Sequence, residues 1–505
     1  MVTPLPLSLA ADSLTALAIL GDNLLWLFVG VIAGMALGII PGMGGVVTLT
    51  IILPFTLKMD PNQAFIVLSA ALGAVSFSGS ISAILINAPG TGGNAATLLD
   101  GYPMAQKGRA AEAIGASATA SAAGAIIGIL FFFIMIPFVI DIALLFGASE
   151  VFWLVLLGLS IVPLVAGERV LAGLSMGGFG LLLAFVGQTS VTGEYRFTFD
   201  LPLLFDGLGL IPPLVGLFAL AEMIKLASSD EGLVPDSVEE VAGSKFDGVK
   251  EVVKHKWLFL RCSSIGMIVG AIPGIGATVA TFIAYGHAVQ SSDNQEEFGE
   301  GRVEGIIATE SANDSKDGGQ LFPTLGLGIP GSASTAVLLG GFIIHGITPG
   351  PSLLQEQLDL MLVIVFALLF SNILTSLIGL AFTGVFVRVQ QVSVSRLFPT
   401  IIILALVATF VLRNNFGDMF LALIFGAIGL VLMYLNVSRI PIIIALILGS
   451  ILERNYFLAI RLADGGPLAA FFSGWLNQLL ILILVVSALL PIIQRLRGGS
   501  LQPES

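Results

Sequence analysis

One run of eleven residues, Thr309 to Gly319, gathers ionisable and amide side chains between long apolar stretches. It contains three carboxylates, one amide and one lysine. Ionisable groups at membrane depth are costly and usually mark the path of an ion or a substrate. Hard oxygen ligands of this kind can hold Na⁺ or relay a proton. We therefore predict an ion-coupling site at Glu310, Ser311, Asn313 and Asp314. A solvated loop outside the membrane is the alternative.

Four Pro-Gly pairs interrupt apolar stretches elsewhere in the chain. Proline removes a backbone donor and glycine adds backbone freedom, so each pair is predicted to break a helix. The freed amides and carbonyls cannot face lipid and must be buried in protein or line a polar cavity. Kinks or tight helix packing are the alternative. The breaks are at Pro41, Gly42 and Gly44, at Pro89 and Gly90, at Pro273, Gly274 and Gly276, and at Pro330 and Gly331.

Small polar residues follow two of these breaks, and a helix is predicted to resume at Ala95 and at Ala336. The N-terminus of a helix carries free N–H donors and partial positive charge, which suit a carboxylate. Glycines in these runs let backbone donors approach the anion. A bond back to the same helix is the alternative for any one hydroxyl. The predicted substrate-binding residues are Asn87, Pro89, Gly90, Thr91, Gly92, Gly93, Asn94, Lys316, Pro330, Gly331, Ser332, Ser334 and Thr335. Hydroxyls near the other two breaks come from Thr48, Thr278 and Thr281.

The composition of the chain predicts that these sites lie in a membrane protein. Of 505 residues, 56% are hydrophobic and only 11% are charged, about half the charged share of a soluble domain. Leu24 to Ile40, Leu360 to Val387 and Leu468 to Ile493 are apolar stretches near or beyond the roughly 20 residues that a spanning helix needs. They show no strand-like alternation. The predicted fold class is an all-α, polytopic membrane protein.

Charge and cysteine content exclude several other classes. The net charge of −12 makes nucleic acid an unexpected partner. A single cysteine, Cys262, excludes an intrachain disulfide, and the three histidines lie too far apart in sequence to form a metal motif. No basic residue occurs in the first twenty, so we expect no cleaved signal peptide. We expect no cofactor beyond Na⁺ or H⁺ as coupling ion.

Basic residues give a predicted topology. The hydrophilic stretch Ala227 to Lys256 is rich in lysine, which places it in the cytoplasm together with Lys107. Leu258 to Tyr285 is then predicted to cross the membrane once, which puts the acidic loop Ser291 to Glu300 outside. This walk gives about eleven crossings and one hairpin-like pair in each half. The N-terminus is predicted to be periplasmic and the C-terminus cytoplasmic.

The two halves contain matching motifs in the same order. Gly38 to Gly44 matches Gly270 to Gly276, and Asn87 to Gly92 matches Gly328 to Ala333. The predicted topology gives matched segments opposite orientations, which is an inverted-topology repeat, a common architecture of secondary transporters. The predicted parts are a first repeat at 1–226, a cytoplasmic linker at 227–256, a second repeat at 257–467, and an extra helix and tail at 468–505.

These motifs together resemble signatures of the TctA family, the large membrane subunit of tripartite tricarboxylate transporters. They are Gly38 to Gly45, Asn87 to Gly93 with Asp100 to Pro103, Ala271 to Gly276, and Glu310 to Asp314 through Gly328 to Ser332. The likeness extends from about Leu24 to Ile493. It implies a translocation subunit in the lipid bilayer of the bacterial inner membrane. It also implies a small four-helix TctB-like membrane subunit, a periplasmic TctC-like binding protein, an ion gradient and a small carboxylate substrate such as citrate.

Matched tips that approach from opposite faces can meet near the midplane, as in elevator-type carboxylate transporters. By that analogy 38–108 and 270–350 form a mobile part, and Val151 to Val165 and Phe398 to Leu412 belong to a scaffold. An ion channel or a transporter of another small organic anion is the nearer alternative. An intramembrane enzyme is disfavoured, because the acids and histidines are dispersed and no His-Glu-x-x-His motif occurs.

Overall fold

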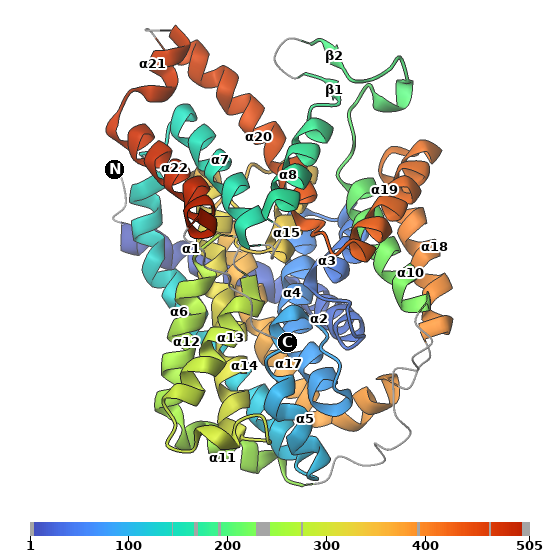
Figure 1. Ribbon diagram of the computed structural model, residues 1–505, viewed down its shortest axis with the longest axis vertical. Coiled ribbons are helices and arrows are strands. Elements are labelled where there is room, and N and C mark those ends of the chain that lie inside the picture. The colour runs from blue at the N-terminus through green and yellow to red at the C-terminus, as the bar shows by residue number, and fades with distance from the viewer. Residues whose placement is uncertain are drawn as a thin grey trace. The chain divides into compact units, whose positions relative to one another are not determined.

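The computed structural model describes residues 5–143, 145–165, 170–189, 193–228, 243–273, 276–390, 394–463 and 466–496. The described chain is helical apart from short connections and one antiparallel pair of two-residue strands, as Figure 1 shows. It divides into two compact units, each built from separated segments. Unit 1 contains Met1–Ile140 and Ile211–Leu430, and unit 2 contains Asp141–Leu210 and Val431–Ser505. The division into successive repeats stays a prediction.

Unit 1 contains the elements that position every predicted site residue. Its first segment contains α1 (Leu5–Asp22), α2 (Leu24–Gly38), α3 (Gly45–Thr56), α4 (Pro61–Ile86), η1 (Gly92–Asn94), α5 (Leu98–Gln106) and most of α6 (Ala110–Ala143). Its second segment begins with α9 (Ile211–Leu214), η3 (Val215–Leu220), α10 (Ala221–Ser228), α11 (Lys245–Lys254), α12 (Lys256–Gly270), α13 (Gly276–Gln290) and η4 (Gln295–Glu297). It continues with α14 (Val303–Leu321), η5 (Phe322–Gly326), α15 (Ala333–Ile344), α16 (Pro351–Glu356), α17 (Leu358–Gln390), α18 (Val394–Arg413) and most of α19 (Phe416–Tyr434).

Unit 2 is smaller and holds none of the predicted site residues. Its helices are α7 (Ala148–Val165), α8 (Val170–Ala184), η2 (Pro202–Leu204), α20 (Ile440–Leu462), α21 (Gly466–Phe472) and α22 (Trp475–Leu496). Its strands are β1 (Gly187–Gln188) and β2 (Tyr195–Arg196). The predicted single helix Leu468 to Ile493 is therefore wrong, because the chain breaks between α21 and α22, where Gly474 adopts a left-handed backbone with φ of 86°.

The predicted helical membrane protein is confirmed. Among the described residues, six helices are long and apolar enough to cross a membrane, or seven if the bent pair α1 and α2 counts as one span. Several further apolar helices, including α3 and α15, have only 10–17 residues. Fewer helices therefore satisfy this criterion than the predicted eleven crossings, because many apolar runs stop at a break.

In the first half, α2 and α3 form a hairpin that packs on α4. Glycines of α2 and α3 approach successive residues of α4: Gly30 approaches Val67, Gly38 approaches Val75, and Gly45 approaches Leu72. Leu53 of α3 and Leu68 of α4 contact the same glycine, Gly341. Thus α2 runs parallel to α4, the chain reverses at Pro41, and α3 runs back.

In the second half, α12 and α13 form a similar hairpin on α14. Gly266 of α12 packs against Ala312 and Gly270 packs against Lys316, so α12 runs parallel to α14. The Cys262 thiol lies 3.7 Å from the carbonyl of Ala284. Arg261 at the start of α12 donates a hydrogen bond of 3.5 Å to Ser291, which follows α13. Leu258 to Tyr285 therefore turns back at Pro273 and does not cross once, which corrects the predicted topology.

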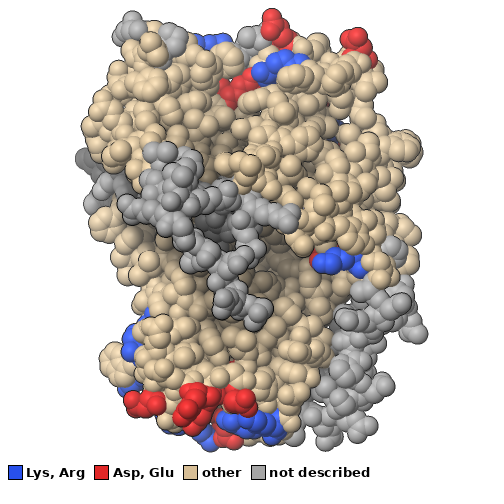
Figure 2. All heavy atoms as spheres, viewed as in Figure 1, with Lys and Arg blue, Asp and Glu red and all other residues tan. Residues whose placement is uncertain are grey.

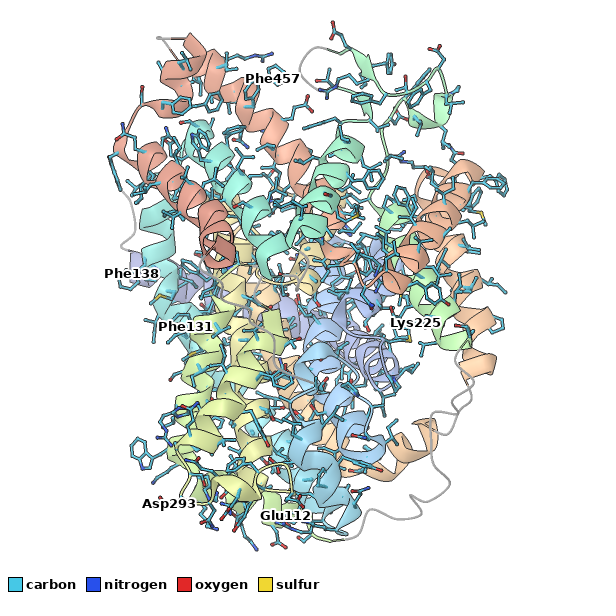
Figure 3. All side chains as sticks on the ribbon, in the orientation of Figure 1. Glu112, Phe131, Phe138, Lys225, Asp293 and Phe457 are labelled. Atoms are coloured by element: carbon cyan, nitrogen blue, oxygen red, sulfur yellow. The ribbon has the colours of Figure 1, made fainter. Side chains whose placement is uncertain are left out.

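The acidic loop and the basic residues lie at the same end of unit 1. Lys107 Nζ is 2.5 Å from the carbonyl oxygen of Glu300 and 3.8 Å from its carboxylate. The prediction that these residues lie on opposite sides is wrong, since Asp and Glu contribute little to membrane orientation. Acidic and basic side chains gather at this end of unit 1, along the lower edge of the view in Figure 2. Figure 3 labels Glu112 and Asp293 at the same edge.

Asp100 holds the end of the acidic loop against α5. Its Oδ1 accepts hydrogen bonds from the backbone N–H groups of Gly299, Gly301 and Arg302, at 3.0, 2.9 and 2.7 Å. Its Oδ2 accepts a hydrogen bond of 3.0 Å from the hydroxyl of Tyr285. A first-half carboxylate thus fixes second-half backbone, and this ties the two halves of the chain together at the charged end.

Candidate functional site

The N-terminus of α3 lies against both polar runs that follow Pro89 and Pro330. We call residues 89–94 tip 1 and residues 330–335 tip 2. A Cβ atom added to Gly44 would lie 3.7 Å from Thr91 Cβ in tip 1. One added to Gly45 would lie 2.6 Å from the Ser334 hydroxyl in tip 2. The first Pro-Gly break thus places a helix start between the two tips.

The N-terminus of α13 completes the group. A Cβ atom added to Gly92 would lie 2.5 Å from Thr278 Oγ1, and one added to Gly93 would lie 2.9 Å from Ala277 Cβ. The helix starts at all four Pro-Gly breaks therefore gather in one region of unit 1. Gly274, the remaining break residue of this set, lies outside the described residues.

Each tip is fixed by its own hydrogen bonds. The N–H of Thr91 donates to Asn94 Oδ1 at 3.0 Å, and the N–H of Ser332 donates to Thr335 Oγ1 at 2.8 Å. Both pairs are reciprocal capping boxes. Helix α15 therefore begins earlier than predicted, at Ala333. At tip 1 only the three-residue 3-10 turn η1 begins at Gly92, and the next α-helix, α5, begins later than the predicted Ala95, at Leu98.

Two of the predicted anion donors are already bonded within the protein. The N–H of Gly90 donates to the carbonyl of Gly79 at 3.3 Å, and that of Gly331 donates to Thr324 Oγ1 at 3.0 Å. These glycines instead allow close packing, because a side chain on Gly90 would collide with the carbonyl of Gly38. Among the backbone amides of the two tips, those of Gly92, Gly93, Ala333 and Ser334 have no acceptor within the described residues.

Helix α14 carries the predicted ion-coupling residues and is buried along its length except at Glu304. This excludes a solvated loop. Glu310 and Asp314 are fully buried, and Asp317 is 2% exposed. Their spacing of four and then three residues puts them on one stripe of the helix. Three carboxylates inside a protein require compensation by hydrogen bonds or by positive charge.

Glu310 receives its compensation from first-half hydroxyls. Ser80 of α4 and Ser121 of α6 donate to Oε2 at 2.7 and 3.0 Å, and Thr97 donates to Oε1 at 2.5 Å. The amide of Asn94 in tip 1 in turn donates to Ser80 Oγ at 2.7 Å. A continuous chain of hydrogen bonds therefore runs from α14 to tip 1.

Asp317 is compensated by its neighbours. Lys316 Nζ lies 2.5 Å from Asp317 Oδ1, and Gln320 Nε2 donates to the same oxygen at 2.7 Å. Both members of the ion pair are buried. The structure thus engages Lys316 with a protein carboxylate, and its predicted contact with a substrate stays a prediction.

Asp314 and Asn313 differ from these groups. Among the described residues neither oxygen of Asp314, nor the oxygen or nitrogen of the Asn313 side chain, has a hydrogen-bond partner. Asn313 Oδ1 lies against Gly93 so closely that a side chain at Gly93 would collide with it. The predicted Glu310, Asn313 and Asp314 are therefore brought together beside tip 1.

Comparison with known proteins now decides the family. Residues 24–444 match the sequence pattern of the family described as "Tripartite tricarboxylate transporter TctA family". The chain belongs to the TctA family. This confirms the resemblance, and TctA proteins are transporter subunits, not enzymes.

Two relatives of the chain come from Agrobacterium vitis. An uncharacterized 52.8 kDa protein in the TAR-I ttuC' 3' region is 34% identical over 488 residues, which cover 94% of this chain and 95% of the relative. An uncharacterized protein in the TAR-II ttuC' 3' region is 32% identical over 239 residues, which cover 46% of this chain and 97% of the relative. No solved structure matches.

Other predicted site residues of this TctA protein have local structural roles. Ser311 donates to the carbonyl of Ala308 at 3.1 Å and is not part of the stripe that contains Glu310 and Asp314. Thr48 and Thr281 donate to carbonyls three to five residues earlier. Asn87 ends α4 in a left-handed conformation with φ of 56°.

The sequence analysis missed five polar residues around α14. They are Ser80, Thr97, Ser121, Asp317 and Gln320. Asp317 and Gln320 follow the helical spacing from Glu310 and could have been found by periodicity. The three hydroxyls come from separate first-half segments, so only the fold brings them to Glu310.

Proposed function

We propose that this TctA protein is the translocation subunit of a secondary transporter that moves a citrate-like di- or tricarboxylate across the bacterial inner membrane. The observation that carries the proposal is the convergence of four helix starts around the two tips. Three of them, the starts of α3, α13 and α15, are N-termini of α-helices, each equivalent to roughly half a positive charge, so together they suit a ligand with two or three carboxylates. The amides of Gly92, Gly93, Ala333 and Ser334 supply donors without a buried arginine.

The direction of α4 and α14 supports an inverted repeat with alternating access. Ser80 of α4 donates a hydrogen bond to Glu310 of α14. One turn later on α4, Ile84 packs against Gly101. The neighbouring Asp100 packs against Gly305, which comes before Glu310 on α14. The two matched helices therefore run antiparallel. Unit 1 contains the described residues of both segments of the proposed mobile part, 38–108 and 270–350. This supports an elevator-type mechanism in which these segments move together. In this scheme Na⁺ or H⁺ drives symport, and Glu310, Asn313 and Asp314 couple the ion.

Family membership also supports the proposed partners. In this scheme a TctC-like periplasmic protein delivers the substrate, and a TctB-like four-helix subunit accompanies the chain. Val151 to Val165, the proposed scaffold segment, lies in unit 2, whereas Phe398 to Leu412 lies in unit 1 with the tips. Of the two segments, only the first is therefore a candidate for a separate scaffold.

Reconstituted uptake tests the proposal. Proteoliposomes containing this chain, the small subunit and the binding protein would be given radiolabelled citrate and a panel of di- and tricarboxylates. We expect saturable uptake that requires both an ion gradient and the binding protein. Non-saturable flux without the binding protein would instead indicate the channel alternative. Uptake of only other organic anions would change the substrate class.

A further inference from the structure

We propose that Asp314 and Asn313 bind one Na⁺ beside tip 1 and that this cation orders the substrate site. The cation site follows from the side chains alone, whereas its effect on substrate rests on the proposed function. Asp314 is fully buried and Asn313 is 1% exposed, so neither can obtain its missing partners from solvent at this position. Leaving a buried polar group without a partner costs about 1–3 kcal/mol, and more for a charged group.

The other charges on α14 are compensated without an added ion. Glu310 accepts three hydroxyl hydrogen bonds, which stabilise the ionised carboxylate. Asp317 is paired with Lys316 and bonded by Gln320. Asp314 has no hydrogen-bond partner at either oxygen, and its neighbours Ser121 and Lys316 are already engaged by Glu310 and Asp317. One uncompensated carboxylate matches one monovalent cation, whereas a divalent ion would leave excess positive charge.

The Asn313 side chain favours Na⁺ over a proton. A proton on Asp314 would neutralise the carboxylate but could bond only one further oxygen. A hard cation takes carboxylate and amide oxygens together. Asn313 and Asp314 also lie between Glu310 and Asp317 along the helix, so all four side chains surround one patch of its surface. Ser121 lies beside both Glu310 and Asp314 and offers a further oxygen.

The same residues connect the cation to the substrate tip. Asn313 Oδ1 packs on Gly93, one of the tip 1 residues whose amide has no acceptor. The Glu310, Ser80 and Asn94 hydrogen bonds hold the rest of tip 1 to α14. A cation that fixes Asn313 therefore also fixes the wall against which Gly93 lies. Ion and substrate then share one ordered element, which is a physical basis for coupled binding.

Thermal unfolding of the purified full chain in detergent tests the cation site without any substrate. NaCl would be titrated against KCl at constant ionic strength. We expect a saturable, Na⁺-specific rise in melting temperature, as for any ligand that binds only the folded state. Asp314→Asn should abolish this rise. Asn313→Leu should increase the half-maximal Na⁺ concentration at least about tenfold, the usual effect of losing one contact to a charged group.

Asp418→Asn is the matched control, because Asp418 is also a buried aspartate of unit 1 with no hydrogen-bond partner at either oxygen, but it lies on α19 with the positive charge of Arg413 nearby. It should keep the wild-type response to Na⁺. An unchanged response in Asp314→Asn, or no Na⁺-specific response in the wild type, would overturn the inference. If Asp314→Asn does not fold, an unchanged midpoint in Asn313→Leu overturns it equally. A Na⁺ response without any carboxylate uptake would instead leave the cation site standing and contradict the proposed function.

Discussion

Ser80 is the residue through which the buried carboxylate of Glu310 reaches tip 1. Its hydroxyl donates to Glu310 at 2.7 Å and accepts from Asn94 at 2.7 Å. Hydrogen bonds to charged groups contribute about 1.5–3 kcal/mol each. We expect Ser80→Ala to reduce the free energy of unfolding by about 2 kcal/mol and to weaken citrate binding, because tip 1 is no longer tied to α14.

Thermal unfolding and equilibrium binding of labelled citrate measure the two effects of Ser80→Ala. Ser264→Ala is the matched control, since the Ser264 hydroxyl is exposed and bonds back to the carbonyl of Leu260 at 2.9 Å. It should change neither quantity. Equal behaviour of the two variants would mean that the hydrogen-bond chain to tip 1 has no energetic role.

Substitutions at two glycines of tip 1 should distinguish a role in packing from a role in substrate binding. A side chain on Gly90 would collide with backbone, whereas one on Gly92 would meet only the Thr278 hydroxyl. We expect Gly90→Ala to lower the yield of folded protein, because overpacking costs about 1–3 kcal/mol. Gly92→Ala should fold and lose citrate affinity. Gly286→Ala, in open space on α13, is the control for both. Normal folding of Gly90→Ala, measured by size-exclusion chromatography, would contradict the packing role.

The predicted site residues differ in how well the sequence alone could locate them. Glu310 and Asp314 were identifiable because charge inside an apolar sequence is rare. The role of Ser311 was mispredicted because proximity in sequence does not put a residue on the same helix face. Ser80 and Ser121 carry no charge, and serines of this kind usually bond within their own helix. Their function became visible only from contacts across the two halves.

At the scale of elements, the return of α13 toward the start of α12 changes the topology. Lys107 and Asp293 should therefore lie on the same side of the membrane. Lys58 should lie on the other side, because it precedes α4, whose 26 residues extend about 39 Å, more than the hydrocarbon core. Single cysteines at these three exposed positions, treated with an impermeant maleimide in right-side-out and inside-out vesicles, measure this.

The native Cys262 is buried and should give no background in that labelling experiment. Labelling of Asp293→Cys and Lys107→Cys from opposite faces would restore the single crossing from Leu258 to Tyr285. The sequence predicted the break at Pro273 but not the reversal, because a kinked crossing and a hairpin have the same hydropathy. The reversal depends on packing, in particular on Gly266 and Gly270 letting α12 approach α14 closely.

At the scale of the whole molecule, the compact units do not follow the order of the chain. Each unit combines segments from both sides of the central hydrophilic stretch. The class of helical membrane protein followed from composition, since so apolar a chain cannot be covered by polar surface. The unit boundaries did not follow, because they depend on which small residues meet across long separations. All four Pro-Gly breaks nevertheless fall in unit 1, so the predicted ion and substrate sites belong to one compact unit.

Placing both sites in one unit predicts reciprocal coupling between Na⁺ and substrate. If Na⁺ at Asp314 and Asn313 orders tip 1, saturating Na⁺ should tighten citrate binding, and citrate should tighten Na⁺ binding by the same factor. Such coupling is typically about 5–150-fold. Calorimetric titration of each ligand in the absence and presence of the other measures both factors.

Asp314→Asn should bring both coupling factors close to one, while Asp418→Asn should leave them unchanged. Two unequal factors would show that the titrations report different processes, and a citrate affinity independent of Na⁺ would separate the cation site from tip 1. Thermodynamic linkage requires equal factors whatever connects the two sites, so it is equal factors above one that are lost in Asp314→Asn that would identify α14 with tip 1 as the element shared by both ligands.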